Sequence, residues 1–312
     1  MKIKKPYFWD LNKPNIWSYI LLPFTAPIIL NNLLLNFKKK KIFKSIKTIC
    51  IGNIYIGGTG KTPLVIKISQ ILKKLDYKSC VIKKFYKTQS DEQKLIKNNT
   101  ELYCFNKRSI ALNEAIKDGI DIALFDDGLQ DGFIDYNIKI VCFNNLKGIG
   151  NGHLIPAGPL REKISNISKY DAIFINGIKK DNQYLIKILR EFSKNIKIFE
   201  TFYKPLNIKE FDVKDKYLIF SGIGNPDTFK ETLIQNNFDI SKDVRFPDHY
   251  QYSKNDINKI KLCAKNLQSK ILTTEKDYLR LSKEDAQGIN YLSVDLSIKD
   301  ENELIKFIQS KI

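Results

Sequence analysis

Cysteine, tryptophan, histidine and methionine are scarce in this 312-residue chain, which contains five, two, two and one of them, respectively. The cysteines are odd in number, lie far apart and form no C-x-x-C pair, so neither a disulfide framework nor a zinc cluster is predicted. A reducing compartment is the simplest interpretation. The chain is long enough to bury a large core and is 43% hydrophobic, which excludes disorder and collagen-like structure.

Arginine is also rare, although the chain is strongly basic. Lysine and arginine total 52 against 34 acidic residues, a formal net charge of +18, yet only five of the 52 are arginines. Arginine is the usual bidentate reader of guanine and phosphate, so the charge gives little support for nucleic-acid recognition. An anionic membrane surface, a phosphorylated substrate or drift in composition remain as explanations. We therefore expect no nucleic-acid partner.

A run of twenty-four uncharged residues, Pro14 to Phe37, is rich in Ile, Leu, Phe and Trp and precedes four lysines at 38–41. Its length could span a bilayer, but Pro23 and Pro27 interrupt helical hydrogen bonding and basic residues flank both ends. An interfacial helix on anionic lipid, a true span and a helix packed on its own domain all remain open, and the membrane interpretations are favoured. The predicted N-terminal segment covers residues 1–45.

From Lys47 onward, short apolar runs alternate with helical periods, a pattern typical of βαβ units and a parallel sheet. This alternation predicts an α/β fold with one domain at 46–205 and a second, smaller α/β lobe at 206–312. Strands are predicted at Thr48–Ile54, Ser79–Lys83, Ile120–Phe125, Ile138–Phe143, Ala172–Asn176, Tyr217–Ser221, Lys270–Thr273 and Tyr291–Val294, and helices at Thr62–Leu75, Asn182–Ser193, Asp227–Asn236, Lys254–Leu267 and Asn302–Gln309.

The strongest local signal is a glycine-rich hexapeptide, GGTGKT at 57–62, between a predicted strand and a predicted helix. Glycines let backbone N–H groups point at phosphate oxygens, Lys61 can reach the β and γ oxygens, and the Thr62 hydroxyl can ligate Mg²⁺. The strict pattern has glycine where this chain has Tyr55, so the loop is a variant. It predicts a P-loop NTPase-like domain whose nucleotide-binding residues are Tyr55, Ile56, Gly57, Gly58, Thr59, Gly60, Lys61 and Thr62.

An acidic pair ends a buried strand, as a metal-dependent phosphate loop requires. Asp126 and Asp127 follow the apolar run IALF, and Gln130 lies on the same turn. We predict Thr62, Asp127 and Gln130 near the metal, with Asp126 orienting water or the loop. ATP and Mg²⁺ are the expected cofactors.

Further short motifs follow one another along the chain: IGN at 51–53, GGTGKTP at 57–63, SDE at 90–92, DDGLQ at 126–130, GNG at 150–152, PAGPLRE at 156–162, GIGNP at 222–226, FPDH at 246–249 and TTEKD at 273–277. In this order they resemble the tetraacyldisaccharide 4'-kinase family of lipid A biosynthesis. A nucleotide loop alone is generic, whereas the DDGLQ and PAGPLRE segments at these spacings are specific. The resemblance also covers the apolar N-terminal helix and both α/β lobes.

The resemblance implies ATP-dependent phosphorylation of the 4'-hydroxyl of an acylated disaccharide 1-phosphate, giving lipid IVA, at the cytoplasmic face of the bacterial inner membrane. It implies that Asp91 and His249 activate the sugar hydroxyl, that Lys61 binds phosphate, and that Arg161 contacts substrate. A carboxylate held by an imidazole is a reasonable proton acceptor for an alcohol. The second lobe is expected to close the cleft, and no obligate protein partner is implied.

The chain departs from the family pattern at four places. Residues 84–87, KFYK, stand where an Arg-Gly-Tyr-Gly segment is usual, and Asp131 stands where a histidine commonly follows the DDGxQ motif. Tyr136-Asn137 replaces Arg-Asp, and a single His249 stands where two histidines often follow Pro-Asp. A membrane-associated P-loop switch or partitioning-type ATPase is the alternative function, because it shares the GGxGKT loop.

Overall fold

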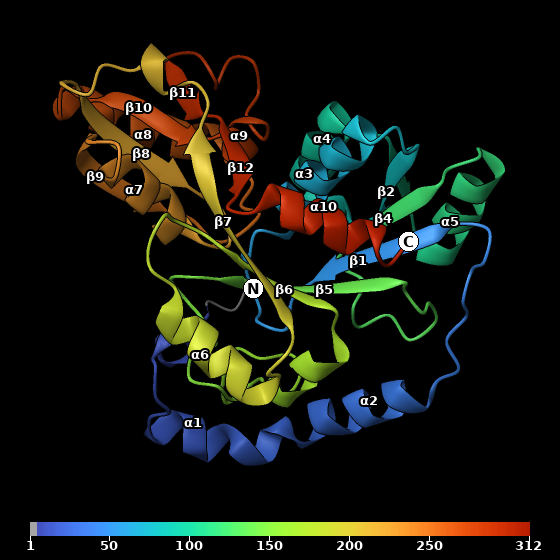
Figure 1. The fold of residues 1–312 in the computed structure, drawn as a ribbon. Helices are drawn as coiled ribbons and strands as arrows, with labels where there is room; N and C mark the ends of the chain where they lie inside the picture. Colours follow the sequence, from blue (N-terminus) through green and yellow to red (C-terminus); the bar gives the residue numbers. More distant parts are fainter. Residues whose placement is uncertain (1–4) are drawn as a thin grey trace.

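The computed structural model describes residues 5–312, with Asn36 and Thr88 described by their backbone alone. Residues 1–4 of the predicted segment 1–45 therefore lie outside the described residues. Two sheets organise the chain: an eight-stranded sheet in the order β12-β7-β6-β5-β1-β4-β2-β3, and a four-stranded sheet in the order β11-β10-β8-β9 (Figure 1). The fold is the predicted α/β arrangement of a parallel-sheet domain, a second lobe and an apolar N-terminal helix.

Apolar runs form the strands of the larger sheet, which is parallel except at one edge. Its strands are β1 (Lys47–Gly52), β2 (Ser79–Lys84), β3 (Leu102–Phe105), β4 (Ile122–Asp126), β5 (Ile138–Asn144), β6 (Ala172–Asn176), β7 (Lys197–Pro205) and β12 (Val294–Ile298). The surrounding helices are α3 (Lys61–Lys74), α4 (Ser90–Asn99), α5 (Arg108–Lys117), α6 (Gln183–Phe192) and α10 (Glu301–Gln309).

Alternating strand residues face two separate cores. Ile49 and Ile51 of β1 lie in the core beneath α3 and α10, whereas Cys50 faces the core beneath α5 on the other side. The α6 helix covers the same second face farther along the sheet. Because side chains of successive strand residues point to opposite faces, this near-continuous apolar pattern is what a sheet covered on both sides requires.

The second lobe is a parallel sheet with helices on both faces. It contains β8 (Lys216–Ser221), α7 (Pro226–Ile234), β9 (Asp239–Arg245), α8 (Lys254–Asn266), β10 (Lys270–Thr274), the short α9 (Glu275–Tyr278) and β11 (Ile289–Leu292). Buried residues of α7 and α8 pack on opposite faces of this sheet. The predicted strands and helices within 216–292 are observed here.

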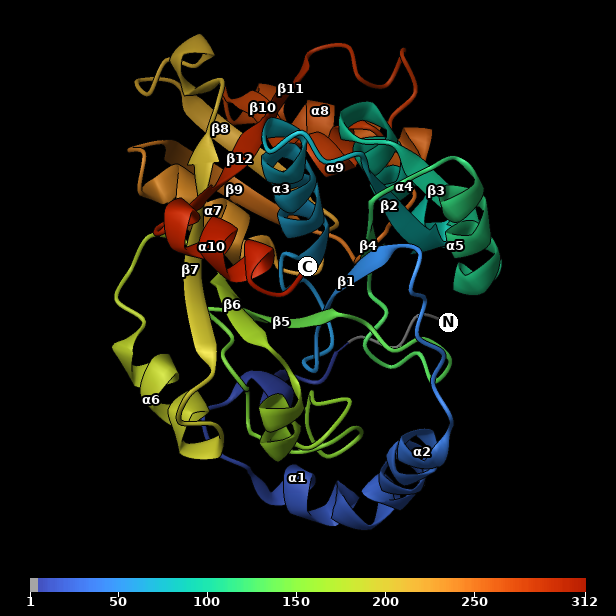
Figure 2. The same cartoon turned by 45° about the vertical axis from the view of Figure 1, so that its right-hand side comes forward.

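The last residues of the chain leave the second lobe, in contrast to the predicted lobe boundaries of 206–312. After β11, the chain returns as β12, which pairs antiparallel with β7 in the larger sheet and places Val294 opposite Pro205 (Figure 2). Buried side chains of α10, such as Phe307, then pack into the core beneath α3. The single predicted strand at Tyr291–Val294 is therefore the end of one strand and the start of another, in different sheets.

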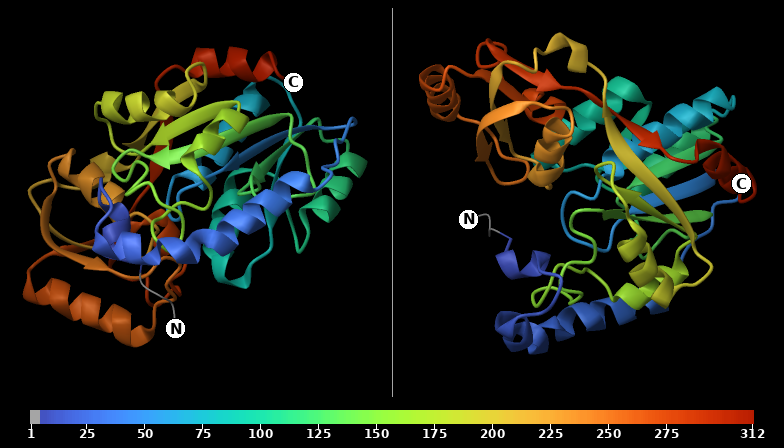
Figure 3. Two further views of the ribbon diagram at one scale, coloured as in Figure 1. Left: turned by 90° about the horizontal axis from the view of Figure 1, so that it is seen from below. Right: turned by 60° about the vertical axis from the view of Figure 1, so that its left-hand side comes forward.

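From Ile16 onward the uncharged N-terminal run is helical, as α1 (Ile16–Leu21), a 3-10 turn at Leu22–Thr25 that contains Pro23, and α2 (Ala26–Phe37). The view from below shows these helices running across the sheet domain (Figure 3). Within the described residues, Ile16–Leu35 is the one stretch long and apolar enough to cross a membrane. Few of its side chains are buried.

Candidate active site

The GGTGKT loop joins β1 to α3 at the carboxyl edge of the larger sheet. Gly60 adopts a left-handed conformation, φ +81°, and a Cβ there would lie 2.9 Å from the Asn176 amide nitrogen and the Tyr203 hydroxyl. Asn176 donates a hydrogen bond of 2.6 Å to the Thr59 carbonyl oxygen. Side chains of β6 and β7 therefore fix the backbone of the loop, and glycine is required at 60.

Lys61 and Thr62, the first residues of α3, face the two aspartates at the end of β4. The Thr62 hydroxyl donates to Asp126 Oδ2 over 3.2 Å, and Lys61 Nζ lies 3.9 Å from Asp127. This meeting follows from the sheet, because β1 and β4 are parallel neighbours whose carboxyl ends lie side by side. The structure thus brings together the predicted phosphate-loop and acidic residues.

Of the predicted nucleotide residues, Tyr55 has a different environment. Its ring packs with Leu154 and Leu160, and its hydroxyl donates to Asp10 and contacts Lys5. The side chain of Tyr55 therefore fastens the N-terminal segment to the sheet domain, and only its backbone belongs to the loop. Ile56 donates its backbone N–H to the Pro159 carbonyl oxygen, which joins the loop to the PAGPLRE segment.

Asp127 is surrounded by cations. Its φ of +62° turns the chain sharply after β4, and its carboxylate lies 3.3 Å from Arg161 as well as near Lys61. Burial alone would raise the pKa of Asp127, but Lys61 and Arg161 outweigh it and hold that pKa below its ordinary value. Asp127 is accordingly a charged carboxylate at the mouth of the phosphate loop.

Gln130 is held by neighbours within the protein. Its amide nitrogen donates to the Asn53 carbonyl oxygen at 3.1 Å and to Glu162 at 3.0 Å, while its oxygen accepts from Arg161 at 3.5 Å. These contacts order the DDGLQ turn against the PAGPLRE segment. The geometry gives the predicted metal role of Gln130 no direct support.

The oxygen atoms around Thr62 fit a magnesium ion. Asp126 is fully buried, and its Oδ1 has no hydrogen-bond partner among the described residues, while its Oδ2 accepts from Thr62. A hydroxyl beside a carboxylate with a free oxygen is the hard-oxygen environment that Mg²⁺ takes in phosphate-loop enzymes, where the ion keeps several waters. Residues 5–312 contain no group of three or more His, Cys, Asp or Glu side chains arranged to hold a metal ion by themselves, so water and phosphate oxygens would complete such a shell.

The Asp91 and His249 side chains meet although they are 158 positions apart. His249 Nδ1 lies 3.1 Å from Asp91 Oδ1, so the first turn of α4 contacts the loop after β9 in the second lobe. Arg280 donates to the other oxygen of Asp91 at 2.6 Å, and Lys276 lies 3.7 Å from it. Burial would raise the pKa of Asp91, yet His249, Lys276 and Arg280 outweigh it and hold that pKa well below its ordinary value of 3.8.

Three charged residues that the sequence did not single out link the two halves of the site. Lys83, at the end of β2, lies 2.6 Å from Asp126 and 2.8 Å from Glu92, and Glu92 lies 2.6 Å from Lys276. Burial would lower the pKa of Lys83, but the Asp126 and Glu92 carboxylates more than offset it and raise that pKa. Glu92 and Lys276 could have been found as members of the SDE and TTEKD motifs, whereas Lys83 belongs to no motif quoted above.

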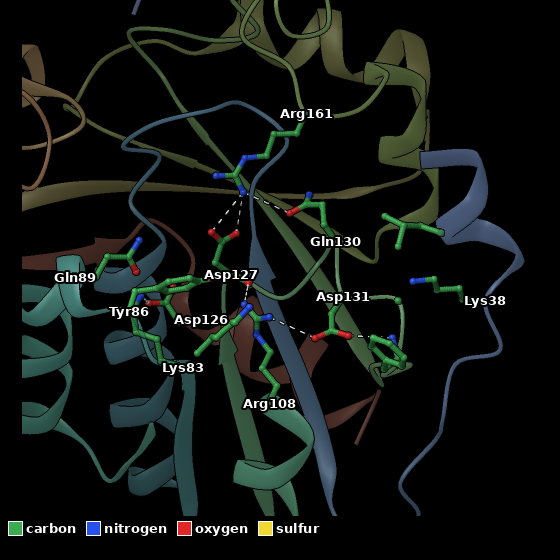
Figure 4. Close-up of a pocket in the computed structure, with 14 residues that line it drawn as sticks. Lys38, Lys83, Tyr86, Gln89, Arg108, Asp126, Asp127, Gln130, Asp131 and Arg161 are labelled. Carbon is green, nitrogen blue, oxygen red and sulfur yellow. Dashed lines mark hydrogen bonds and ion pairs between the residues drawn. The ribbon is translucent and has the colours of Figure 1, made fainter. Parts of the chain in front are cut away.

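A pocket of about 500 Å³ opens beside these residues (Figure 4). It is lined from the sheet edge by Asp126 and Asp127, and from the N-terminal helix by Leu35 and Lys38. The residues that complete its wall are Lys83, Lys84, Tyr86, Gln89, Arg108, Gln130, Asp131, Gly132, Phe133 and Arg161. Five of its side chains are basic and three are acidic, so the pocket suits an anionic, polar ligand.

Two of the four departures from the family pattern, the KFYK segment and Asp131, fall around this pocket. Lys84 lies 5.3 Å from the centre of the Tyr86 ring, and both side chains line the wall. Arg108 lies 3.4 Å from Asp131 and donates to the backbone oxygen of Asp127. A lysine therefore provides the charge in the altered KFYK segment, and Asp131 fixes an arginine at the pocket.

Comparisons with known proteins match this chain over nearly its whole length. The sequence pattern of the family described as "LpxK: Tetraacyldisaccharide-1-P 4'-kinase" matches residues 18–312. The tetraacyldisaccharide 4'-kinase of Pelagibacter ubique (strain HTCC1062) is 51% identical over 98% of both chains. The enzyme of the same name from Rickettsia bellii (strain OSU 85-389) is 30% identical over all of this chain and 99% of its own.

The fold has a solved counterpart. The crystal structure of LpxK from Aquifex aeolicus in complex with ATP is similar with a TM-score of 0.69 and 22% sequence identity, covering 95% of this chain and 99% of that one. At this identity the likeness concerns the fold alone. The family match and the full-length similarity to the Pelagibacter protein go further, and together they show that this chain belongs to the tetraacyldisaccharide-1-P 4'-kinase family.

Proposed function

We propose that this protein transfers the γ-phosphoryl group of ATP to the 4'-hydroxyl of a tetraacyldisaccharide 1-phosphate, giving lipid IVA for lipopolysaccharide biosynthesis. Family membership supports the reaction. The observation that carries it in this chain is the juxtaposition of a phosphate loop with a carboxylate and imidazole pair, joined by the Asp126, Lys83, Glu92 and Lys276 contacts.

The nucleotide half of the site would bind ATP through the loop backbone and Lys61. When bound, Mg²⁺ would neutralise charge on the β and γ phosphates, held by Thr62 with Asp126 and Asp127 beside it. Phosphoryl transfer passes through a loose transition state, so these residues act mainly by positioning phosphate oxygens and neutralising their charge. Asp127 is already paired with Lys61, and arriving phosphate would compete for that lysine.

The acceptor half would bind the sugar in the pocket between α2 and the sheet edge. Arg161, Arg108 and Lys84 supply positive charge for a phosphorylated head group. Asp91 would accept the hydroxyl proton, and His249 would hold the carboxylate in place. With its pKa held low, Asp91 is a weak base, so proton transfer would come late, after the bond to the leaving group has largely broken.

The apolar helices would place the enzyme on the membrane that holds its lipid substrate. Ile16, Phe24 and Leu34 are each more than half exposed on α1, the 3-10 turn and α2. Polar contacts tie the opposite side to the sheet domain, because Asn151 donates to Ser18 and Asn32 donates to the Arg161 carbonyl oxygen. A helix held to the domain at both ends lies along the bilayer surface rather than across it. We therefore propose peripheral association with an anionic leaflet, on the cytoplasmic side where ATP is available.

A phosphotransfer assay with γ-³²P-labelled ATP and tetraacyldisaccharide 1-phosphate tests this function. We expect labelled lipid from the wild-type protein and a loss of at least 100-fold with Lys61→Ala, since a phosphate-binding cation is removed. Lys97→Met, an exposed lysine on α4, is the matched control and should keep full activity. Rapid ATP hydrolysis without lipid, and no labelled lipid, would instead favour the membrane-associated ATPase switch.

A further inference from the structure

Lys83 is a buried cation between the two halves of the site. Its side chain is 5% exposed at the end of β2, and its Nζ contacts one carboxylate from β4 and one from α4, Asp126 and Glu92. A buried lysine is costly unless it is paired, and both of its partners are themselves largely buried. The two carboxylates therefore stabilise the charged ammonium group of Lys83 at this buried position.

The Asp126 and Glu92 carboxylates contact different halves of the site. Asp126 Oδ2 accepts from Lys83 and also from Thr62, the candidate metal-binding hydroxyl, while its other oxygen has no partner among residues 5–312. Glu92 uses one oxygen for Lys83 and the other for Lys276 of the second lobe. Lys276 in turn lies 3.7 Å from Asp91. An alternation of negative and positive side chains thus runs from Thr62 to the candidate base.

We propose that Lys83 is a positioning residue for phosphoryl transfer: its ammonium group holds Asp126 against Thr62 and Glu92 against Lys276, so that the metal-side carboxylate and the acceptor-side pair keep one fixed geometry. The inference rests on the proposed function for its reaction. Lys83 does not itself act on the reacting atoms. Without the Lys83 charge, the buried Asp126 and Glu92 carboxylates would repel each other, and Asp126 Oδ2 would lose its fixed position beside the Thr62 hydroxyl.

Binding of Mn²⁺ in the presence of ATP, followed by electron paramagnetic resonance, tests this role without any lipid. Replacing a residue that orients a metal ligand typically weakens metal binding by about 10- to 100-fold, and we expect this for Lys83→Met. Lys83→Arg keeps the charge and should recover most of the affinity. Lys97→Met should bind Mn²⁺ as the wild type does.

Wild-type Mn²⁺ affinity in a Lys83→Met protein that merely melts at a lower temperature would overturn the proposal and leave Lys83 a structural residue. If Lys83→Met fails to fold, the Lys83→Met/Glu92→Gln double variant removes the repulsion between the carboxylates. We expect the double variant to fold and still bind Mn²⁺ weakly, and normal binding in it would equally overturn the inference.

The test is separable from that of the proposed function. A wild-type protein that binds Mn²⁺ and ATP but labels no lipid would contradict the kinase assignment, while the comparison of Lys83 variants would remain decisive for the positioning role. Conversely, a fully active kinase with an Mn²⁺ affinity independent of residue 83 would contradict the positioning role alone.

Discussion

The Asp91 carboxylate belongs to the sheet domain, but its partners come from the second lobe. His249 contacts one oxygen, and Arg280 and Lys276 approach the other. The candidate base is therefore assembled only where the two lobes meet. We propose that this arrangement couples activation of the acceptor hydroxyl to closure of the second lobe, which would limit phosphoryl transfer to water.

Asp91 and His249 should act as one unit. We expect Asp91→Asn and His249→Asn each to lower kcat by about 10²- to 10⁴-fold, because the first removes the proton acceptor and the second removes the imidazole that holds it. The double variant should lose little more than the worse single variant, since residues acting as a unit are not additive. Steady-state kinetics of the four proteins check this, with exposed Asp239→Asn as the unaffected control. Multiplicative losses would contradict a shared role.

Arg280 should control stability in acid. Its side chain is 1% exposed and pairs with Asp91 and Asp277, so Arg280→Met leaves two buried carboxylates and should cost about 3–5 kcal/mol in the free energy of unfolding. In the wild type, the lowered pKa of Asp91 contributes stability that is present above its ordinary value of 3.8 and is lost as pH falls through the lower folded value.

The Arg280→Met protein should consequently unfold at a higher pH than the wild type during acid titration, because the pKa of Asp91 rises when that cation is removed. Urea titrations at neutral and acidic pH, followed by circular dichroism, measure both effects. Lys254→Met removes an exposed lysine paired with exposed Glu284 and serves as the control. It should change the free energy of unfolding by no more than about 0.5 kcal/mol at either pH. An unchanged acid midpoint for Arg280→Met would show that Asp91 does not depend on this pair.

Individual residues were predictable where a motif surrounds them. The resemblance paired Asp91 with His249, and the structure places their side chains 3.1 Å apart. Lys83 and Arg280 gave no such signal, because a lysine ending a strand and an arginine after a short helix are usually solvated. Their roles arise from burial, which depends on how the two sheets are placed.

At the scale of elements, the α1 to α2 run combines an apolar outer side with polar attachment to the PAGPLRE segment. Pro23 lies in the 3-10 turn at Leu22–Thr25 and Pro27 in the first turn of α2, so neither proline breaks the run, which stays helical from Ile16 to Phe37. The sequence predicted helix and apolarity, but the attachment through Asn32 to the Arg161 carbonyl oxygen needed the fold. This contact holds the second half of α2 against the sheet domain, and Leu35 of the same helix lines the candidate substrate pocket.

Charge on the apolar side should detach the protein from membranes. Phe24 is 64% and Leu34 is 56% exposed, so Phe24→Glu/Leu34→Glu should leave folding intact. Each lost apolar insertion is worth about 1.5–3 kcal/mol, so binding to anionic vesicles should fall by at least 100-fold in a sedimentation assay. Leu262→Glu alters a 61% exposed leucine on α8 and serves as the control. Equal vesicle binding by the double variant and the control would contradict the interfacial role.

Strands differed in how readily they could be predicted. β1 and β6 are buried with apolar centres, and both were predicted to within two residues of their observed bounds. β9, Asp239–Arg245, is an edge strand with mostly polar residues and was missed, because no apolar run marks it. β7 begins with Lys197 and has only partial burial along its length, which explains its omission.

For the molecule as a whole, the two lobes touch directly at the phosphate loop. A Cβ added to Gly224 of the second lobe would lie 2.5 Å from the Gly58 nitrogen. Asn144 of the sheet domain also donates to Thr228, and Lys147 pairs with Asp227 at the start of α7. The backbone of the phosphate loop is therefore in direct contact with the second lobe, so a movement of that lobe would change the packing of the loop.

Gly224→Ala should hold the lobes apart. The added methyl group cannot fit against the Gly58 backbone, so we expect kcat to fall by at least tenfold while the free energy of unfolding changes by less than about 1 kcal/mol. Gly119→Ala is the control: its added methyl group meets open space, and only the left-handed backbone, with a φ of +67°, opposes the substitution. It should lose about 1 kcal/mol of stability and keep normal kinetics. Normal turnover by Gly224→Ala would argue against lobe contact during catalysis.

The order of elements along the chain predicted the wrong lobe for β12 and α10. β12 and α10 carry ordinary strand and helix patterns, and their place after β11 favoured the second lobe. What decides their location is the free edge of β7 and the apolar space beneath α3, which Leu296 and Phe307 fill. Neither feature can be read from residues 294–312 themselves.

The pairing of β7 with β12 makes the entire second lobe an insertion between two adjacent strands. Pro205 and Val294 face each other in antiparallel register, so a two-residue Asn-Gly turn could replace residues 206–293 and convert the strands into a β-hairpin. We expect such an excised protein to fold, melt cooperatively and bind vesicles, but to transfer no phosphate because Asp91 has lost its cations. A single cooperative transition in thermal denaturation of this protein would show that the sheet domain folds without the second lobe.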